Sequence, residues 1–434
     1  MMLPTTFALC ISLAAAAVSP RAPEQTAQDR PASSDERLAQ LERTNAELAR
    51  RLDLLAEELE SQDHGDTFTP VGAAHHGLAP AASKIYFAKG RLSIGGYGEM
   101  LYTNRQGGSV TDELDFLRAI LYVGYKFDEK WLLNTEFEFE HASVEDTADG
   151  DSAGSVSVEF AYLEYLATAA FSVRAGLLLI PMGFVNEIHE PTTFWSANRP
   201  EIERLIIPST WRENGIGVVG ATDQLEYRAY MVNGLDAEGF TSNGLRGGRQ
   251  KGSEAKVEDV AFVGRLDYVG IDNLLVGGSL YWGNSGQDLD VGSVRTTIVD
   301  VHAEYQWRGL RLRGLGILAQ LDDVAELNGE LGFTGAASIG EELSGYYLEA
   351  GYDVLNGAGT RQALIPFVRF ERYDTQDDVP DGFAENAARD AQNWTFGVAW
   401  KPTEQVIIKA DYVDADNDAG TGQDLLRLSM GYVF

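Results

Sequence analysis

Apolar and polar residues alternate with a period of two from residue 91 to the end of the chain, which is the pattern of β-strands. The clearest stretch is 131–141, where Leu133, Phe137 and Phe139 share one face. The opposite face carries Asn134, Glu136, Glu138 and Glu140. A soluble β-sandwich buries such an apolar face, whereas a membrane-spanning barrel turns it outward and keeps the polar residues inside.

This pattern predicts sixteen strands. They are expected at 91–103, 114–126, 130–141, 155–166, 170–180, 213–221, 224–233, 260–269, 273–283, 294–307, 310–322, 343–354, 361–373, 392–400, 405–415 and 424–434. The connections after odd-numbered strands are long, and those after even-numbered strands are short. Such alternation is typical of an up-and-down barrel. We therefore predict an all-β fold, a 16-stranded antiparallel transmembrane β-barrel over residues 90–434.

The last ten residues are predicted to close this barrel. Every second one is apolar or aromatic: Leu426, Leu428, Met430, Tyr432 and Phe434. No further segment follows to cover this face, so we expect it to contact lipid, with the strand paired to residues 94–101. The strand ending in Phe434 resembles the one by which the assembly machinery of bacterial outer-membrane barrels recognises them, which makes that machinery an expected partner.

The chain before the barrel divides into four segments. Residues 1–19 are apolar with small residues near their end, which predicts a secretory signal peptide; a short buried helix is the alternative. Residues 20–36, rich in Pro, Ser and Gln, predict a linker. A coiled coil is expected at 37–61 and a Gly/Ala/Pro-rich tether at 62–89.

The coiled coil rests on seven residues spaced alternately three and four positions apart. They are Leu38, Leu41, Asn45, Leu48, Leu52, Leu55 and Leu59. An amide at an a-type position, here Asn45, is typical of coiled coils whose register and oligomer number are fixed. The spacing therefore predicts self-association in the periplasm; an amphipathic helix packed on its own chain is the alternative.

Composition excludes several classes of function. After the first twenty residues no apolar run approaches the ~20 residues of a membrane-spanning helix. Residues 1–89 carry 8 basic and 12 acidic side chains, so −28 of the net charge of −32 lies on the barrel region. Nucleic-acid binding needs basic surface and is not expected. The single cysteine, Cys10, lies in the signal segment, so no disulfide or thiolate metal site is predicted for the mature chain.

The longest connection, residues 181–212, is unusually apolar for a loop. It contains Phe184, Phe194, Trp195 and Trp211, which a freely exposed loop would leave in water. We expect it to fold into the lumen and narrow the channel. Four of the charged residues that it would bring to the pore are Glu187, Arg199, Arg204 and Arg212.

Four motifs in the barrel region resemble the phosphate-selective porin O and P family. They are Gly95-Gly-Tyr-Gly-Glu99 and the stretches 174–184, 199–215 and 366–374. The resemblance covers residues 90–434 and implies a sixteen-stranded, trimeric outer-membrane porin with an inward-folded third loop. We accordingly expect a homotrimer, held through barrel and coiled coil, in contact with outer-membrane lipid and lipopolysaccharide.

The charge of the predicted lumen departs from this family, in which arginines and a lysine ladder are held responsible for phosphate selectivity. The predicted pore-lining set is Arg118, Glu136, Glu138, Glu140, Arg174, Glu187, Arg199, Arg204, Arg212, Arg265, Asp300, Glu304, Arg311, Arg313, Lys409 and Arg427. A lumen of mixed charge predicts passive diffusion of ions and small hydrophilic solutes, with weak cation preference or none. A phosphate- or anion-selective porin is the alternative.

No enzyme, cofactor or metal site is predicted. An outer-membrane hydrolase would need a nucleophile beside a base. His302 is expected to face inward between Asp300 and Glu304, but no serine motif is placed to use it. A structural tether of the cell envelope is a further alternative.

Three stretches have more than one interpretation. In 155–166, Glu164 falls on the apolar face, and 361–373 fits either orientation. A β-bulge or an error in the strand boundaries would explain both. Residues 414–420 carry acidic side chains at alternate positions before a glycine, as in a calcium loop. That glycine comes one place late for an EF-hand, and solvated surface acids are expected instead.

Overall fold

The computed structural model describes residues 71–107, 110–144, 154–168 and 170–434, with five positions nearer the N-terminus: Gln40, Thr44, Glu47, Arg50 and Arg51. These five positions are helical and exposed, and Arg51 forms an ion pair of 2.7 Å with Glu47. The predicted signal peptide and linker, and the leucine seam of the predicted coiled coil, lie outside the described residues.

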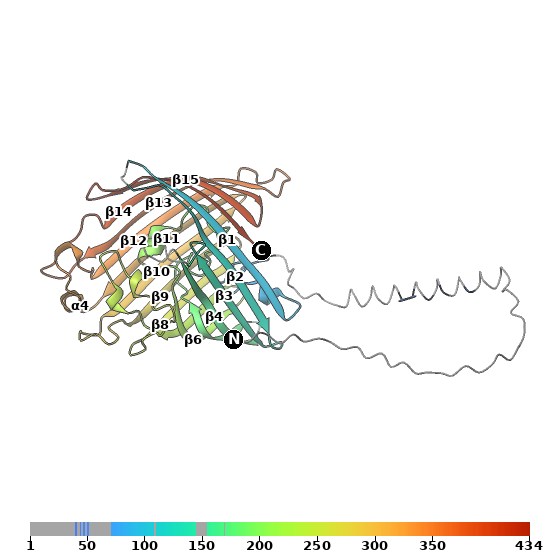
Figure 1. Cartoon of the computed structure of the whole chain (residues 1–434), viewed down its shortest axis with the longest axis horizontal. Helices are drawn as coiled ribbons and strands as arrows, with labels where there is room; N and C mark the ends of the chain where they lie inside the picture. The colour runs from blue at the N-terminus through green and yellow to red at the C-terminus, as the bar shows by residue number, and fades with distance from the viewer. Residues whose placement is uncertain are drawn as a thin grey trace, which may run out of the picture. The chain divides into compact units, whose positions relative to one another are not determined.

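Sixteen antiparallel strands form one closed barrel. They are β1 (Leu92–Arg105), β2 (Glu113–Lys126), β3 (Trp131–Glu140), β4 (Ser155–Thr168), β5 (Phe171–Leu179), β6 (Arg212–Ala221), β7 (Leu225–Asn233), β8 (Val260–Ile271), β9 (Leu274–Asn284), β10 (Arg295–Trp307), β11 (Leu310–Leu321), β12 (Glu342–Tyr352), β13 (Ala363–Asp378), β14 (Asp390–Thr403), β15 (Val406–Asn417) and β16 (Leu425–Val433). In Figure 1 the blue first strand lies beside the red strands of the chain end. The predicted 16-stranded barrel is confirmed.

Closure depends on the pairing of β1 with β16, which sets Tyr97 opposite Val433. The outward ring of Tyr432 lies over Gly98, where an ideal Cβ would stand 2.5 Å from the tyrosine hydroxyl. Only glycine leaves room for the ring there, and an aromatic ring that covers a strand glycine stabilises the strand pair.

The two ends of the barrel differ. At the short-turn end the connections are 127–130, 169–170, 222–224, 272–273, 308–309, 353–362 and 404–405. At the long-loop end they are 106–112, 141–154, 180–211, 234–259, 285–294, 322–341, 379–389 and 418–424. The helices α3 (Glu201–Leu205) and α4 (Val324–Glu330) and the 3₁₀ turns η2 (Ala237–Gly239), η3 (Arg246–Gly248) and η4 (Gly335–Ala337) lie in these long connections.

The outer face of the barrel is apolar and exposed, and the interior holds the packed core. On β10, Val301 is 63% exposed, whereas its neighbours Asp300 and His302 are buried. The core is made by long connections packed on the inner wall, as with Trp211 against Tyr281 at 4.8 Å between ring centroids. This arrangement inverts the order of a soluble sandwich, as the alternation predicted.

Residues 71–89 are not the free tether that the sequence predicts over 62–89. They belong to the same compact unit as the barrel, and the short helix α2 (Lys84–Phe87) precedes β1. Leu78, Ala82 and Ile85 are buried. The small residues of this stretch show no regular period, so the sequence suggested flexible chain where the structure has close packing.

Candidate functional site in the barrel interior

Charged side chains gather on the inner face of the barrel wall. From the predicted set these are Arg118, Glu136, Glu138, Glu140, Arg174, Arg212, Arg265, Asp300, Glu304, Arg311, Arg313, Lys409 and Arg427. Most are buried, but Glu140, Glu304, Arg311 and Arg313 retain some exposure. Side chains of alternate residues reach the same face, so strand parity brings this set together.

Most of the inward arginines have a carboxylate partner. Arg174 Nε lies 2.8 Å from Glu164, and Arg427 Nε lies 2.7 Å from Asp411. Arg118 lies between Glu99 at 3.6 Å and Glu138 at 3.8 Å. Buried charges of one sign are costly unless paired, which explains why basic and acidic residues occur together here.

The connection 180–211, called segment 180–211 below, reaches the wall opposite to its origin. It leaves β5 and returns at β6, yet the backbone N–H of Ala197 donates to Asp411 on β15 at 2.6 Å. The N–H of Glu201 donates to Glu371 on β13 at 2.9 Å. In a closed ring of sixteen strands β13 stands opposite β5, so these bonds link the two walls.

A second group of bonds fixes the start of the segment near β10. Asp300 accepts a hydrogen bond from the Gly183 N–H at 3.2 Å. The ring of His302 lies between Asp300 at 2.6 Å and Asp267 at 2.8 Å. Arg265 Nε lies 2.8 Å from the same Asp267. The hydrogen-bond partners of the His302 ring among the described residues are thus Arg265, Asp267 and Asp300, and the same cluster holds this segment.

The aromatic residues of the segment pack against cations of the wall. Arg311 stacks over Trp195 at 3.8 Å, and Lys409 lies over Phe194 at 3.6 Å from the ring centroid. Arg313 stacks over the ring of Phe184 at 4.5 Å. Such contacts are favourable when the cation is desolvated, which explains why the loop is rich in Phe and Trp.

The other predicted residues of the segment differ in environment. Glu187 is buried 3.2 Å from Arg228. Arg199 is buried, and its Nη2 has no hydrogen-bond partner among the described residues. Burial, with Arg118 nearby, lowers the pKa of Arg199. Arg204 is the exception, because its side chain is 41% exposed and pairs with Glu201 on the same helix.

Segment 180–211 has a cavity on each side. One, of about 230 Å³, opens among residues of β13–β16 and the long-loop end and is lined by Arg199, Arg369 and Arg427. The other, of about 220 Å³, is lined by Phe184 and Glu187 with wall residues of β7–β11. The two share no lining residue, and segment 180–211 contributes to the lining of both.

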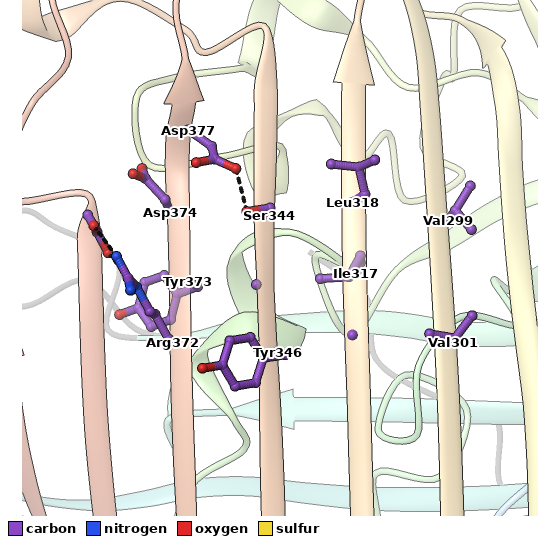
Figure 2. Close-up of a pocket in the computed structure, with 13 residues that line it drawn as sticks. Val299, Val301, Ile317, Leu318, Ser344, Tyr346, Arg372, Tyr373, Asp374 and Asp377 are labelled. Carbon is purple, nitrogen blue, oxygen red and sulfur yellow. Dashed lines mark hydrogen bonds and ion pairs between the residues drawn. The ribbon is translucent and has the colours of Figure 1, made fainter.

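A cavity of about 680 Å³ lies on the outer wall over β10–β13 instead. Figure 2 shows Val299, Val301 and Leu318 along it, with Ser344 bonded to Asp377. Its outward lining includes exposed apolar residues of the face that surrounds the barrel. This groove is therefore separate from the charged interior.

Sequence parity missed several inward residues for local reasons. In β4 the register with β3 shifts between Glu136 and Phe137, so the expected bulge is present, and Glu164 is buried. In β13, the strand with two possible orientations, the charged residues Arg369 and Glu371 are buried, as are Ile365 and Phe367 on the same face. The inward orientation of these residues follows from how their strands pair with their neighbours, and no signal in the sequence gives that register.

The fold and the charged interior define a class of protein, the 16-stranded β-barrel with an apolar outer wall. OmpF of Salmonella typhi, solved in complex with daunomycin, matches with a TM-score of 0.54 and 13% identity over 79% of this chain and 97% of that one. A loop L8 deletion mutant of OmpT, an outer membrane protein of Vibrio cholerae, matches with a TM-score of 0.51 and 12% identity over 79% and 99%. At these identities the likeness concerns the fold alone.

The chain belongs to the same family as a protein of Aquifex aeolicus (strain VF5) that is described as "Uncharacterized protein". The two are 39% identical over 366 residues, which cover 82% of this chain and 83% of the relative. No family model matches the chain.

Two further findings apply to the described part of the chain. None of its helices has the length and apolar character needed to span a membrane. Nor does it contain a group of three or more His, Cys, Asp or Glu side chains that could hold a metal ion.

Proposed function

We propose that this protein is an outer-membrane porin through which ions and small hydrophilic solutes diffuse passively. The observation that carries the proposal is the inverted barrel: exposed apolar side chains such as Val301 and Leu428 surround a wall whose inner face bears charged groups. The apolar outer face is suited to contact with lipid, and the charged inner face is suited to a water-filled passage. The likeness in fold to outer-membrane barrels supports the same conclusion.

Segment 180–211 is the proposed constriction, folded inward as a third loop. Its bonds to opposite walls and the separate cavities on its two sides support this role. The proposed pore-lining residues are those predicted from strand parity, with Arg369 and Glu371 added. Arg204 is proposed to lie near the long-loop mouth because its side chain is partly exposed.

The proposed selectivity is weak. Arg174, Arg265, Arg313 and Arg427 each have a carboxylate within 2.8 Å, so their fields largely cancel at the distance of a passing ion. We therefore expect a small preference for cations, or none, in a lumen that attracts neither sign strongly.

Planar-bilayer recording tests the function. The purified protein is expected to insert and give stepwise open-channel currents in KCl, with a zero-current potential close to zero or of the cation-selective sign under a KCl gradient. A lipid bilayer without protein is the control. Silent insertion would contradict the porin and favour a structural tether or a hydrolase.

An anion-selective porin, including a phosphate-selective one, is the second candidate. The buried guanidinium of Arg199 favours it, because Arg199 makes no ion pair within 4.0 Å among the described residues and faces the cavity of about 230 Å³. A strongly anion-selective zero-current potential that falls in Arg199→Gln would establish it over the weakly selective porin.

The remaining partners belong to the same proposal. We propose that the barrel stands in the bacterial outer membrane in contact with lipid and lipopolysaccharide, and that the assembly machinery recognises the strand ending in Phe434. The heptad spacing over 37–61 supports a homotrimer with its coiled coil in the periplasm. The termini of the barrel then lie at its periplasmic, short-turn end.

A further inference from the structure

Residues 71–89 pack against the inner wall at the short-turn end, and the wall is shaped to receive them. An ideal Cβ on Gly124 of β2 would stand 2.6 Å from the Cβ of Ile85, so a larger residue at that position would displace α2. The carbonyl of Ala82 accepts a hydrogen bond of 3.0 Å from Asn134 on β3. Ile85 and Ala82 are both buried.

Polar contacts hold the same residues to β4 and β5. The Tyr86 hydroxyl donates to Glu164, and Arg174 Nη2 donates to that hydroxyl at 3.0 Å. Arg174 Nη1 also reaches the carbonyl of His76 at 3.4 Å. The ion pair between Glu164 and Arg174 therefore has part of its bonding capacity satisfied by residues 71–89.

One side chain joins these residues to segment 180–211. Glu190 Oε1 accepts hydrogen bonds from the N–H groups of Ala81 at 2.8 Å and Ala82 at 3.0 Å. Burial raises the pKa of Glu190 to about 8, and nearby Glu136 acts in the same direction, while the two N–H bonds lower it. A glutamine would keep the shape of this side chain and an oxygen that accepts these two hydrogen bonds.

The same residues form part of the cavity at the short-turn end. His75, His76 and Gly77 line the cavity of about 220 Å³ opposite Arg228 and Arg313 of the wall. The φ of Gly77 is +82°, and an ideal Cβ there would stand 2.3 Å from Arg228 Nε. The backbone at Gly77 thus lies so close to the charged wall that only glycine fits there.

We propose that residues 74–88 are an N-terminal plug, a second constriction that fills part of the lumen at the short-turn end and is latched to segment 180–211 through Glu190. This proposal rests on the proposed porin function, because a constriction limits conductance only if solutes pass through the lumen. In the wild-type protein, segment 180–211 and the plug would limit the conductance in series.

Cysteine labelling tests the plug without recording currents. In a Cys10→Ser background, Ala82→Cys is expected to react slowly with a membrane-impermeant maleimide, because Ala82 is buried, whereas Phe87→Cys, at a position 46% exposed, should react fast. Adding Glu190→Ala to Ala82→Cys should raise its labelling rate by roughly tenfold or more as the plug undocks. Glu190→Gln, which keeps an acceptor, should leave the rate near that of Ala82→Cys alone.

Where Glu190→Ala does not fold, Asn134→Ala replaces it, because this change removes the donor to the Ala82 carbonyl. Labelling of Ala82→Cys as fast as Phe87→Cys in otherwise unaltered protein would overturn the plug. So would equal labelling rates for Ala82→Cys with and without the substitution that folds.

Conductance gives the second readout. Replacing residues 74–88 by a Gly/Ser segment of equal length should raise single-channel conductance by about twofold or more, because a flexible chain leaves the lumen. The control replaces residues 356–361, an exposed turn at the same end, and should leave conductance unchanged. Currents of equal size in wild type and the 74–88 variant would overturn the plug. Silent channels with the expected labelling pattern would instead contradict the porin and leave the docked plug in place.

Discussion

Asp267→Leu is expected to lower the free energy of unfolding by about 3–5 kcal/mol, as when one partner of a buried ion pair is removed. Asp267 is fully buried. Its carboxylate oxygens lie 3.1 Å from Arg228 Nη1, 2.8 Å from Arg265 Nε and 2.8 Å from His302 Nε2. A leucine at this position would leave the buried guanidinium groups of Arg228 and Arg265 without the carboxylate of Asp267, which neutralises part of their charge. Urea unfolding of the folded barrel in detergent micelles measures the change.

Glu226→Leu is the matched control, because Glu226 also faces Arg228 but lies 3.8 Å away with a side chain that is 37% exposed. A partly exposed pair of this kind contributes within about 1 kcal/mol. Equal losses of stability for Asp267→Leu and Glu226→Leu would show that the buried ion pairs of Asp267 stabilise the barrel no more than a partly exposed pair does.

Glu203→Ala is expected to raise the single-channel conductance by roughly 1.5- to 3-fold, because it frees the constriction. Glu203 accepts hydrogen bonds from the N–H groups of Phe184 at 2.8 Å and Val185 at 2.7 Å. Its other oxygen accepts from the Tyr347 hydroxyl of β12 at 2.7 Å. One carboxylate therefore joins the two ends of segment 180–211 to the wall, and its loss lets the segment move out of the lumen.

Glu201→Ala is the control for this experiment. Glu201 lies on the same helix, α3, but its carboxylate bonds to Arg204, at 2.8 Å from Nε, and not to the wall. Its conductance should equal that of wild type. Tyr347→Phe, which removes a single bond, should give a smaller rise and serves where Glu203→Ala does not fold; an unchanged conductance in both Glu203→Ala and Tyr347→Phe would contradict the anchoring role.

The fold was predictable because each strand carries its own signal. A one-residue error in register would turn every side chain of a strand to the other face. Once Val299 and Val301 are assigned to the outer face, Asp300 and His302 must therefore point inward. The length of the connections supplied an independent test of topology, and Phe434 marked the closing strand. These signals are local and survive in a single sequence.

The contents of the lumen were harder to predict because they depend on contacts between distant residues. Glu190 accepts a hydrogen bond from Ala81, which lies 109 residues earlier in the chain. The stretch 71–83 has no hydrophobic period from which its packing could be predicted. Likewise, a single bulge in β4 hid the inward orientation of Glu164, and the pattern around Pro366 left the orientation of Arg369 open. Those positions follow from register and tertiary contact, which alternation alone does not encode.

Swelling of proteoliposomes in iso-osmotic sugars tests whether small solutes pass through this lumen. Liposomes containing the purified protein are expected to swell in arabinose clearly faster than protein-free liposomes, and to swell in the trisaccharide raffinose no faster than them, since two constrictions limit size. Arabinose swelling equal to that of protein-free liposomes would show that small solutes do not pass and that the protein is not a porin.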